Sequence, residues 1–583
     1  MQFKRRQRSF IFSICLILLG LLLAACGGST AQQSSNNGKA PDNQQVLVIP
    51  ISGVNDLQSF DPALVTEPNS INAVNMVFTG LVQLDDHLQV QDQLAASHSV
   101  SSDGLTWTFK LKPGLKFSDG AALTSDDVAY SLDRALDPNL KSAVSTVYLG
   151  LLKDAQKRAA GQVTTLIGDS ILTPDKQTIV LKTSANAAYF LQTLTYQTSY
   201  VVEKSMIDKY GNSFASHLSE GIGGDGPFKV TSYTPGQSIV FVPNDNYYGP
   251  HAQLKKVVMA FYKQSDSVFR AYQNGQIDWA NVPSSELETV KGQAEFHRVP
   301  QLKTDFYTMN YLAPPFNNVK IRQAFDLALN KDVIAHSIYK DKVIPSNHIL
   351  PSGMVGYNPN LTGPQAVTST QGNATLAKQL LADGMKEEGY TAATFPSVTL
   401  SFSTMGFADT ENEVSATQQM WKQVLGINVQ LREIDFNTLL VERTKTANNP
   451  HGMQMWRLYW SADYPDPQNW LTLIFDKGSP KNAFNYGQNN TPEAKAQQAN
   501  QLLMEQADSN QNATERISQY NQAEQALVND VAWIPIFQDA QTLMRKSCVV
   551  GVVDNAQNFI PANDWGNIYI SSATPCVDTS MYH

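Results

Sequence analysis

Segments typical of β-strands and of α-helices alternate along the whole chain, and this alternation constrains the fold most strongly. Residues 46–51 form an apolar run typical of a buried strand, whereas residues 107–112 alternate like a half-exposed strand. Thr124 to Asp127 matches the capping box that starts a helix. Further strands are predicted at residues 238–242, 256–261, 427–432 and 532–537, and helices at residues 318–330, 416–425 and 514–528. The pattern predicts α/β architecture, and the 583 residues predict two or more domains.

The first 26 residues have the order of an export signal. Several basic residues precede an apolar run over residues 10–23, which is too short for a comfortable membrane span. Two alanines then lead to Cys26, as in a bacterial lipoprotein signal. We expect residues 1–25 to be removed and Cys26 to carry a lipid that anchors the protein to a membrane. An ordinary secretory signal, with Cys26 incidental, is the alternative. Residues 26–45 are rich in Ser, Asn, Gln and Gly and predict a flexible tether.

Charge and cysteine content fit an exported chain. Removal of the four basic groups of the signal takes the formal net charge from −9 to −13. Such an acidic body argues against nucleic acid or anionic lipid as the main partner. After Cys26 only Cys548 and Cys576 remain, and outside the cell they predict a disulfide. Two free buried thiols are the alternative.

Common catalytic and metal-binding motifs are absent from the sequence. It contains no phosphate loop, no His-Glu-x-x-His, no Cys-x-x-Cys and no Gly-x-Ser-x-Gly elbow. The nine histidines are scattered, and none pairs with another at ligand spacing. The sequence therefore favours a protein that is not an enzyme and has no metal or cofactor. The absence of these motifs does not exclude a catalytic site assembled from residues that are distant in sequence.

One stretch, residues 459–467, combines an acid with aromatic rings. Asp463 lies among Tyr459, Trp460 and Tyr464, just before a proline-rich turn. A carboxylate walled by aromatic rings suits an organic cation, because charge-assisted hydrogen bonds and cation–π attraction act together. The free amino terminus of a peptide is the simplest such cation. The alternative is a strand end and turn in which Asp463 caps the backbone.

Several tracts, in this order, carry a family resemblance. They are residues 59–63 with Glu67, 77–82, 103–120 with 124–128, 224–230, 246–249, 274–278, 315–325 and the stretch around Asp463. Together they resemble the oligopeptide- and dipeptide-binding proteins of ABC importers, the family 5 extracellular solute-binding proteins. The resemblance covers nearly all of residues 46–583, and the long tract at 103–128 is the most specific part of it.

The resemblance implies an α/β, two-lobe periplasmic-binding-protein-like fold of type II, with a hinge and an additional third domain. Lobe one would comprise residues 46–80, 203–304 and 541–583. The additional domain would comprise residues 81–202, and lobe two residues 305–540. Most residues of the tracts that carry the resemblance are expected to stabilise the fold rather than to contact the ligand.

The family also implies ligand-binding residues. Its Trp-x-x-Asp pattern assigns Asp463 to the peptide's α-ammonium group and Trp460 to the wall of the site. Glu67, which follows the Asp-Pro turn, is a further candidate, with a surface acid as the alternative. Arg457 is a candidate for the peptide carboxylate, with a structural ion pair as the alternative. The chain departs from some relatives at Ser461, where they carry a cysteine.

The function implied is that of a monomeric, membrane-anchored receptor. It would capture peptides between its lobes and deliver them to the transmembrane subunits of an ABC permease. Receptors for nickel chelates, opines or oligosaccharides are alternatives within the family, although no histidine cluster supports nickel. An exported hydrolase or a sensory or adhesive lipoprotein would be alternatives of another class.

Overall fold

The computed structural model describes residues 38–52, 56–262, 265–283, 285–405, 407–572 and 576. The predicted signal, Cys26 and most of the tether lie outside the described residues. No helix in the described part of the chain is both long and apolar enough to span a membrane.

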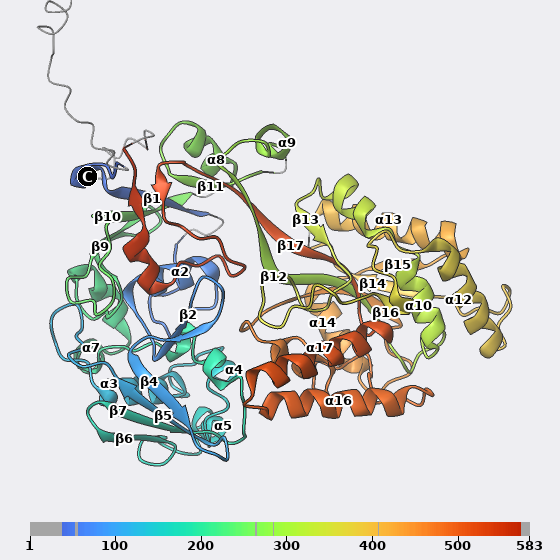
Figure 1. Cartoon of the computed structure of the whole chain (residues 1–583), viewed down its shortest axis with the longest axis horizontal. Coiled ribbons are helices and arrows are strands. Elements are labelled where there is room, and N and C mark those ends of the chain that lie inside the picture. The colour runs from blue at the N-terminus through green and yellow to red at the C-terminus, as the bar shows by residue number, and fades with distance from the viewer. Residues whose placement is uncertain are drawn as a thin grey trace, which may run out of the picture.

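A four-stranded sheet forms the centre of the first half of the molecule (Figure 1). Its strand order is β1 (Val46–Ser52), β10 (Lys256–Tyr262), β9 (Ser238–Pro243) and β8 (Phe228–Thr234). β1 runs parallel to β10, as its apolar run predicts for a strand covered on both faces. Helix α2 (Pro68–Val77) packs on one face and α8 (Ser265–Gln273) packs on the other. The predicted strands at 46–51, 238–242 and 256–261 are confirmed.

Residues 81–202 contain a separate antiparallel sheet with its own core. Its strands are, in order, β4 (Ala95–Val100), β5 (Thr106–Leu111), β7 (Thr178–Lys182) and β6 (Ile171–Asp175). The β2 (Val82–Leu84) and β3 (Val90–Asp92) hairpin precedes it. Gly104 turns the chain between β4 and β5 at φ +73°, and a Cβ there would lie 2.1 Å from the Asn186 side chain. The predicted capping box is present, with Thr124 and Asp127 at the start of α3 (Ser125–Ala135).

The second half of the molecule is built on a seven-stranded sheet. Its main order is β11 (Trp279–Asn281), β17 (Ile534–Arg545), β12 (Phe296–Met309), β16 (Met455–Ser461), β14 (Thr399–Phe402) and β15 (Gln430–Glu433), with β13 (Val343–Pro345) also on β17. Helices α10 (Val319–Leu327), α12 (Ala374–Glu387) and α13 (Ala408–Leu425) cover one face. Helices α14 (Phe436–Thr446), α16 (Ala494–Ser509) and α17 (Ala513–Asn529) cover the other.

Two long strands, β12 and β17, run between the halves (Figure 1). They pair antiparallel from Phe296↔Met544 to Tyr307↔Ile534. Their register shifts between Pro300 and Thr304, close to the predicted lobe boundaries at 304/305 and 540/541. Lys303 lies at this irregularity, and its ammonium contacts the Asp539 carboxylate at 2.5 Å. A break in register at this point makes the strand pair suited to bend there.

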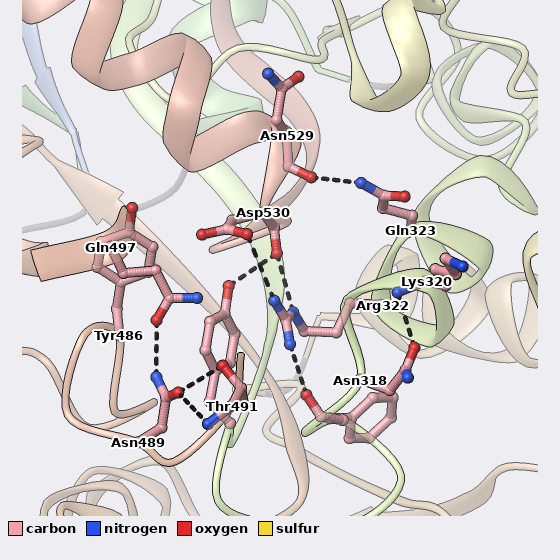
Figure 2. A network of polar contacts seen from close by, with 12 residues as sticks. Asn318, Lys320, Arg322, Gln323, Tyr486, Asn489, Thr491, Gln497, Asn529 and Asp530 are labelled. Carbon is pink, nitrogen blue, oxygen red and sulfur yellow. Dashed lines mark hydrogen bonds and ion pairs between the residues drawn. The ribbon is translucent and has the colours of Figure 1, made fainter. Parts of the chain in front are cut away.

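Residues 315–325, one of the tracts that carry the family resemblance, make contacts that hold helices together, as Figure 2 shows. Asn318 caps α10, because its side-chain oxygen accepts hydrogen bonds from the first turn. The fully buried Arg322 donates from Nη1 to the Phe316 carbonyl and from Nε to the Asp530 carbonyl, both at 2.9 Å. The guanidinium thus joins α10 to the end of α17.

Cys548 and Cys576 form a disulfide with Cα atoms 5.8 Å apart. Next to it, β18 (Val549–Val550) pairs with β19 (Tyr569–Ile570), and the Ala40 amide donates to the Ile570 carbonyl at 2.8 Å. The disulfide therefore closes the C-terminal segment on itself, and the hydrogen bond from Ala40 joins this segment to the first described residues.

Replacing Cys548 and Cys576 together by serine is expected to lower the free energy of unfolding by about 3.5 kcal/mol. The bridge closes a loop with a sequence separation of 28, and its loss returns conformational entropy to the unfolded chain. Thermal unfolding with and without reductant measures the effect. Reductant should lower the midpoint of the parent and leave the double-serine variant unchanged. Equal midpoints for parent and variant would contradict the stabilising role.

Candidate functional site

The stretch that carries Asp463 is the end of a central strand followed by a capped turn. β16 ends at Ser461, and Asp466 then caps the short helix η6 (Pro467–Asn469) by accepting a 2.9 Å hydrogen bond from the Gln468 amide. Pro467 occupies the first helical position, where its missing N–H costs nothing. The strand-end and turn geometry is therefore present, but the capping acid is Asp466. Asp463 is left for another role.

A buried ion pair holds this turn against the helices behind it. The Arg516 guanidinium on α17 donates two hydrogen bonds to the Asp466 carboxylate, at 2.8 and 2.5 Å. Its Nε also donates to the Ala507 carbonyl of α16 at 3.2 Å. Both charged side chains are almost wholly enclosed. The position of Asp463 thus depends on contacts about 50 residues away in sequence.

Asn469 orients both Asp463 and Trp460. Its side-chain oxygen accepts from the Asp463 amide at 3.0 Å and from Trp460 Nε1 at 3.2 Å. Its Nδ2 donates to Asp463 Oδ2 at 3.2 Å. Asn469 is fully buried, so these bonds are shielded from water. Sequence reasoning missed this residue, because an asparagine in a turn carries no local signal of such a role.

Tyrosines of residues 81–202 face the Asp463 turn. Tyr148 and Tyr196 stack with ring centroids 3.6 Å apart. Burial is the main reason that the pKa of each is raised, and the nearby Asp463 charge adds to the rise. Tyr189 stacks on Tyr464 with centroids 5.9 Å apart. Aromatic rings from both halves of the molecule therefore surround the acid.

Asp463 is a half-buried carboxylate that forms no ion pair with any described residue. Burial raises its pKa, while the Asn469 hydrogen bond and the Lys481 charge act in the opposite direction. The ammonium of Lys481 lies 5.1 Å from the centre of the Trp460 ring. A charged group kept out of water without a direct counter-ion is unfavourable, so the site is well prepared for a cation.

Glu67 lies at the start of α2 and serves as its cap. Its carboxylate accepts hydrogen bonds from the Asn69 amide at 2.8 Å and from the Ser70 amide at 2.6 Å. The negative charge also favours the helix N-terminus. The preceding Asp61 pairs with Arg134 at 2.5 Å. Both oxygens of Glu67 are thus engaged within the protein.

Arg457 lies on the opposite face of β16 from Trp460, since side chains three apart in a strand point to opposite sides. Its Nε contacts Glu413 at 2.5 Å and its Nη2 contacts Asp305 at 2.8 Å. Only 6% of Arg457 is exposed. This geometry favours the structural ion-pair alternative for Arg457. Its side chain lies on the face of β16 opposite to Trp460.

A cavity of about 590 Å³ lies at the other end of β16, away from this cluster. Its lining includes Thr399, Ser401, Arg432, Lys445 and Gln454. It contains none of the residues that surround Asp463. We therefore take the Asp463 cluster, where charge and aromatic rings converge, as the candidate site.

A family model for the middle part of the bacterial extracellular solute-binding proteins, family 5, matches residues 89–482. The chain belongs to this family. The oligopeptide-binding protein OppA of Bacillus subtilis is 26% identical to it over 556 residues, which cover 94% of this chain and 97% of OppA. The dipeptide-binding protein DppE of Bacillus subtilis is 26% identical over 517 residues, covering 88% and 90%.

Solved structures of family 5 proteins share the fold. The unliganded open form of the murein tripeptide-binding protein MppA superposes with a TM-score of 0.79 at 22% identity, covering 91% of this chain and 98% of MppA. A structure of Escherichia coli MppA gives a TM-score of 0.63 at 22% identity, covering 90% and 98%. The predicted two-lobe type II fold is therefore confirmed. Family 5 consists of binding proteins rather than enzymes.

Replacing Asp466 by asparagine is expected to lower the free energy of unfolding by about 3–5 kcal/mol, because it leaves the Arg516 charge buried without a partner. Chemical denaturation measures the change. The matched control is Asp169→Asn, which removes an ion pair to Lys153 whose side chains are about half exposed. That variant should change stability by less than about 1 kcal/mol. Similar midpoints for the two variants would show that the buried pair does not hold the turn.

Proposed function

We propose that this chain is the substrate-binding lipoprotein of an ABC importer and that it captures peptides by their free amino terminus at Asp463. The half-buried carboxylate without an ion-pair partner, enclosed by aromatic rings from both halves of the molecule, carries this proposal. The names of its relatives agree with it, since OppA and DppE are described as oligopeptide- and dipeptide-binding proteins.

Capture of an ammonium group follows from the charges at the site. An α-ammonium donates up to three hydrogen bonds, and Asp463 accepts with the oxygen atom that Asn469 leaves free. The Trp460 ring and the tyrosine rings add cation–π attraction of about 0.5–2 kcal/mol. A neutral sugar would leave the buried carboxylate uncompensated, so the site favours a cationic end group over an oligosaccharide.

Closure of the two lobes would complete the site. The chain resembles the unliganded open form of MppA more closely than the other MppA structure, with TM-scores of 0.79 and 0.63. Ligand contacts to both Asp463 and the tyrosines of residues 81–202 would favour a closed state over an open one. The irregular pairing near Lys303 is the place where the connecting strands would bend.

Attachment to a membrane belongs to the same proposal. A lipid on Cys26 and a tether over residues 26–45 would hold the body near the permease while allowing it to turn. The first described residues pair with the C-terminal segment, so the tether would leave the body from lobe one. Delivery of the peptide to the transmembrane subunits would then need no diffusion away from the membrane.

Replacing Asp463 by asparagine is expected to weaken binding of peptides with a free amino terminus by at least about 100-fold, because breaking a buried charge pair costs about 3–5 kcal/mol. Calorimetry with a short peptide and its N-acetylated form measures the loss. The acetylated form should bind the parent poorly and the variant equally poorly.

Native mass spectrometry of the parent provides the wider test of function. Co-purified intact peptides with free amino ends are expected. A bound sugar or metal chelate together with no peptide affinity would overturn the proposal, and cleaved peptides would point to a hydrolase. The Asp169→Asn variant, changed at an exposed acid, should bind peptides like the parent.

Peptide affinity is expected to fall as the pH decreases, beginning above the usual range of an aspartate. Burial raises the pKa of Asp463, and only the ionised form pairs with an ammonium group. Below the pKa of the free protein, affinity should fall about tenfold per pH unit, because binding must first remove a proton. Calorimetry of parent and Asp463→Asn between pH 3 and 7 checks this. An equal slope for both proteins would assign the pH dependence to another group.

A further inference from the structure

The cavity of about 590 Å³ at the other end of β16 from Asp463, called the distal cavity below, has polar walls. Thr399 and Ser401 line it from β14, and Lys445 lines it from α14. A helix that covers a sheet usually fills the space between them with apolar side chains. The polar lining of the distal cavity therefore has no role in the hydrophobic core.

The alternation of side chains along β14 explains why hydroxyl groups face this space. Leu400 and Phe402 belong to the core on the other face of the sheet, so Thr399 and Ser401 point the opposite way. Ser401 is paired in register with Arg432 of β15, which lines the same cavity. Only 3% of Ser401 is exposed, and its hydroxyl forms no hydrogen bond with another described residue. An enclosed hydroxyl normally has a partner, so this one is available to a ligand.

The charged groups of the lining leave one positive charge in excess. Arg432 and Glu442 neutralise each other through two hydrogen bonds, at 2.6 and 2.8 Å. Lys445 lies almost one helical turn after Glu442 and forms no ion pair within the described ranges. The Arg432 hydrogen bond is the main reason that the pKa of Glu442 is lowered, and the Lys445 charge adds to the effect. His451 offers a further hydrogen-bonding group at the rim.

The loop that closes the distal cavity is held in place by the protein itself. Gln454 Nε2 donates to the Pro314 carbonyl at 3.0 Å, and Gln454 Oε1 accepts from the Thr399 amide at 3.1 Å. Gly452 lies so near to the end of α14 that a Cβ there would be 2.8 Å from Thr446 Cα. The walls are therefore fixed before a ligand arrives, as is usual for small-molecule sites.

We propose that the distal cavity binds a small organic anion through a carboxylate or phosphate group. The hydroxyls of Thr399 and Ser401 would donate hydrogen bonds to the oxyanion, and the Lys445 ammonium would supply the opposite charge. The cavity volume lies within the range of about 300–1,000 Å³ that is common for sites of small organic ligands. An inorganic ion would fill only a small part of it. The formal net charge of the whole chain is −9, so a cavity with a positive excess is a departure from the character of this protein.

The distal cavity is separate from the site at Asp463. β16 covers Met455–Ser461, and a strand rises by about 3.3 Å per residue, so the two ends of β16 lie about 20 Å apart. All residues that line the cavity lie between 313 and 454, in the second half of the molecule. Bending near Lys303 would therefore leave the cavity unchanged. Anion binding should be independent of peptide binding, and the proposal does not rest on the proposed function.

Calorimetry of the full chain in a chloride buffer, with inorganic phosphate, glycerol 3-phosphate and succinate as probes, tests the proposal. We expect at least one organic probe to bind more tightly than inorganic phosphate. Lys445→Met should weaken its binding about tenfold or more, because a charge-assisted hydrogen bond is lost, and Ser401→Ala about fivefold. Tighter binding of glycerol 3-phosphate than of succinate would assign the site to phosphate, and the reverse order would assign it to carboxylate.

The control is Lys477→Met, whose ammonium pairs with Glu505 at 3.1 Å outside the distal cavity and which should keep the parental affinity for every probe. Because Lys445 is exposed, Lys445→Met should unfold in denaturant at the same midpoint as the parent, which shows that it is folded. Asp463→Asn should bind the probes like the parent, since the two sites are independent.

Three results would overturn the proposal. The first is that no probe binds the parent. The second is binding that Lys445→Met and Ser401→Ala leave unchanged, which would place the anion elsewhere and make Lys445 an ordinary solvated lysine. The third is an equal loss of probe binding in Asp463→Asn, which would place the anion at the Asp463 site.

Discussion

The antiparallel pairing of β12 with β17 is the constraint on which the rest of the structure depends. These two strands belong to the sheet of the second half and also reach the first half, so they connect bodies that have separate cores (Figure 1). Their backbone hydrogen bonds keep the halves together while the irregularity near Lys303 leaves one place for bending. The candidate-site residues at the end of β16 are positioned relative to these strands, since β16 pairs directly with β12.

The buried framework of this acidic protein and its candidate site differ in whether their enclosed charges form ion pairs. Arg322, Arg457 and Arg516 are enclosed, and each donates hydrogen bonds to acids or carbonyls of the second half of the molecule. Such pairs are costly to break and therefore tie strands and helices together. Asp463 differs because it is partly enclosed and forms no ion pair within the described chain. A carboxylate of this kind, next to aromatic rings, supports the proposed site for a cationic ligand.

The local sequence pattern predicted many of the helices and strands but not all of the residues at which they begin and end. The helix expected at 514–528 is α17, which has an asparagine cap at Asn512. The helix expected at 416–425 is only the second half of α13, because its start after Phe407 has no side-chain cap to mark it. The strand expected at 427–432 begins at Gln430 in β15. Ends without a cap or a turn residue are set by packing, which a local window does not contain.

The sequence by itself determined the family through its contiguous tracts and the α/β architecture through periodicity, and the two-lobe arrangement followed from the resemblance to that family. It also singled out the stretch around Asp463, where an acid and aromatic residues are contiguous. Tertiary structure decided which residues accompany Asp463. Asn469, Tyr148 and Tyr196 reach it through the folding of the chain, while Arg457, only six residues away in sequence, points to the other face of β16. The physical reason is that a strand alternates its side chains and a turn is placed by distant partners such as Arg516. Neighbourhood in sequence therefore did not predict neighbourhood in the site.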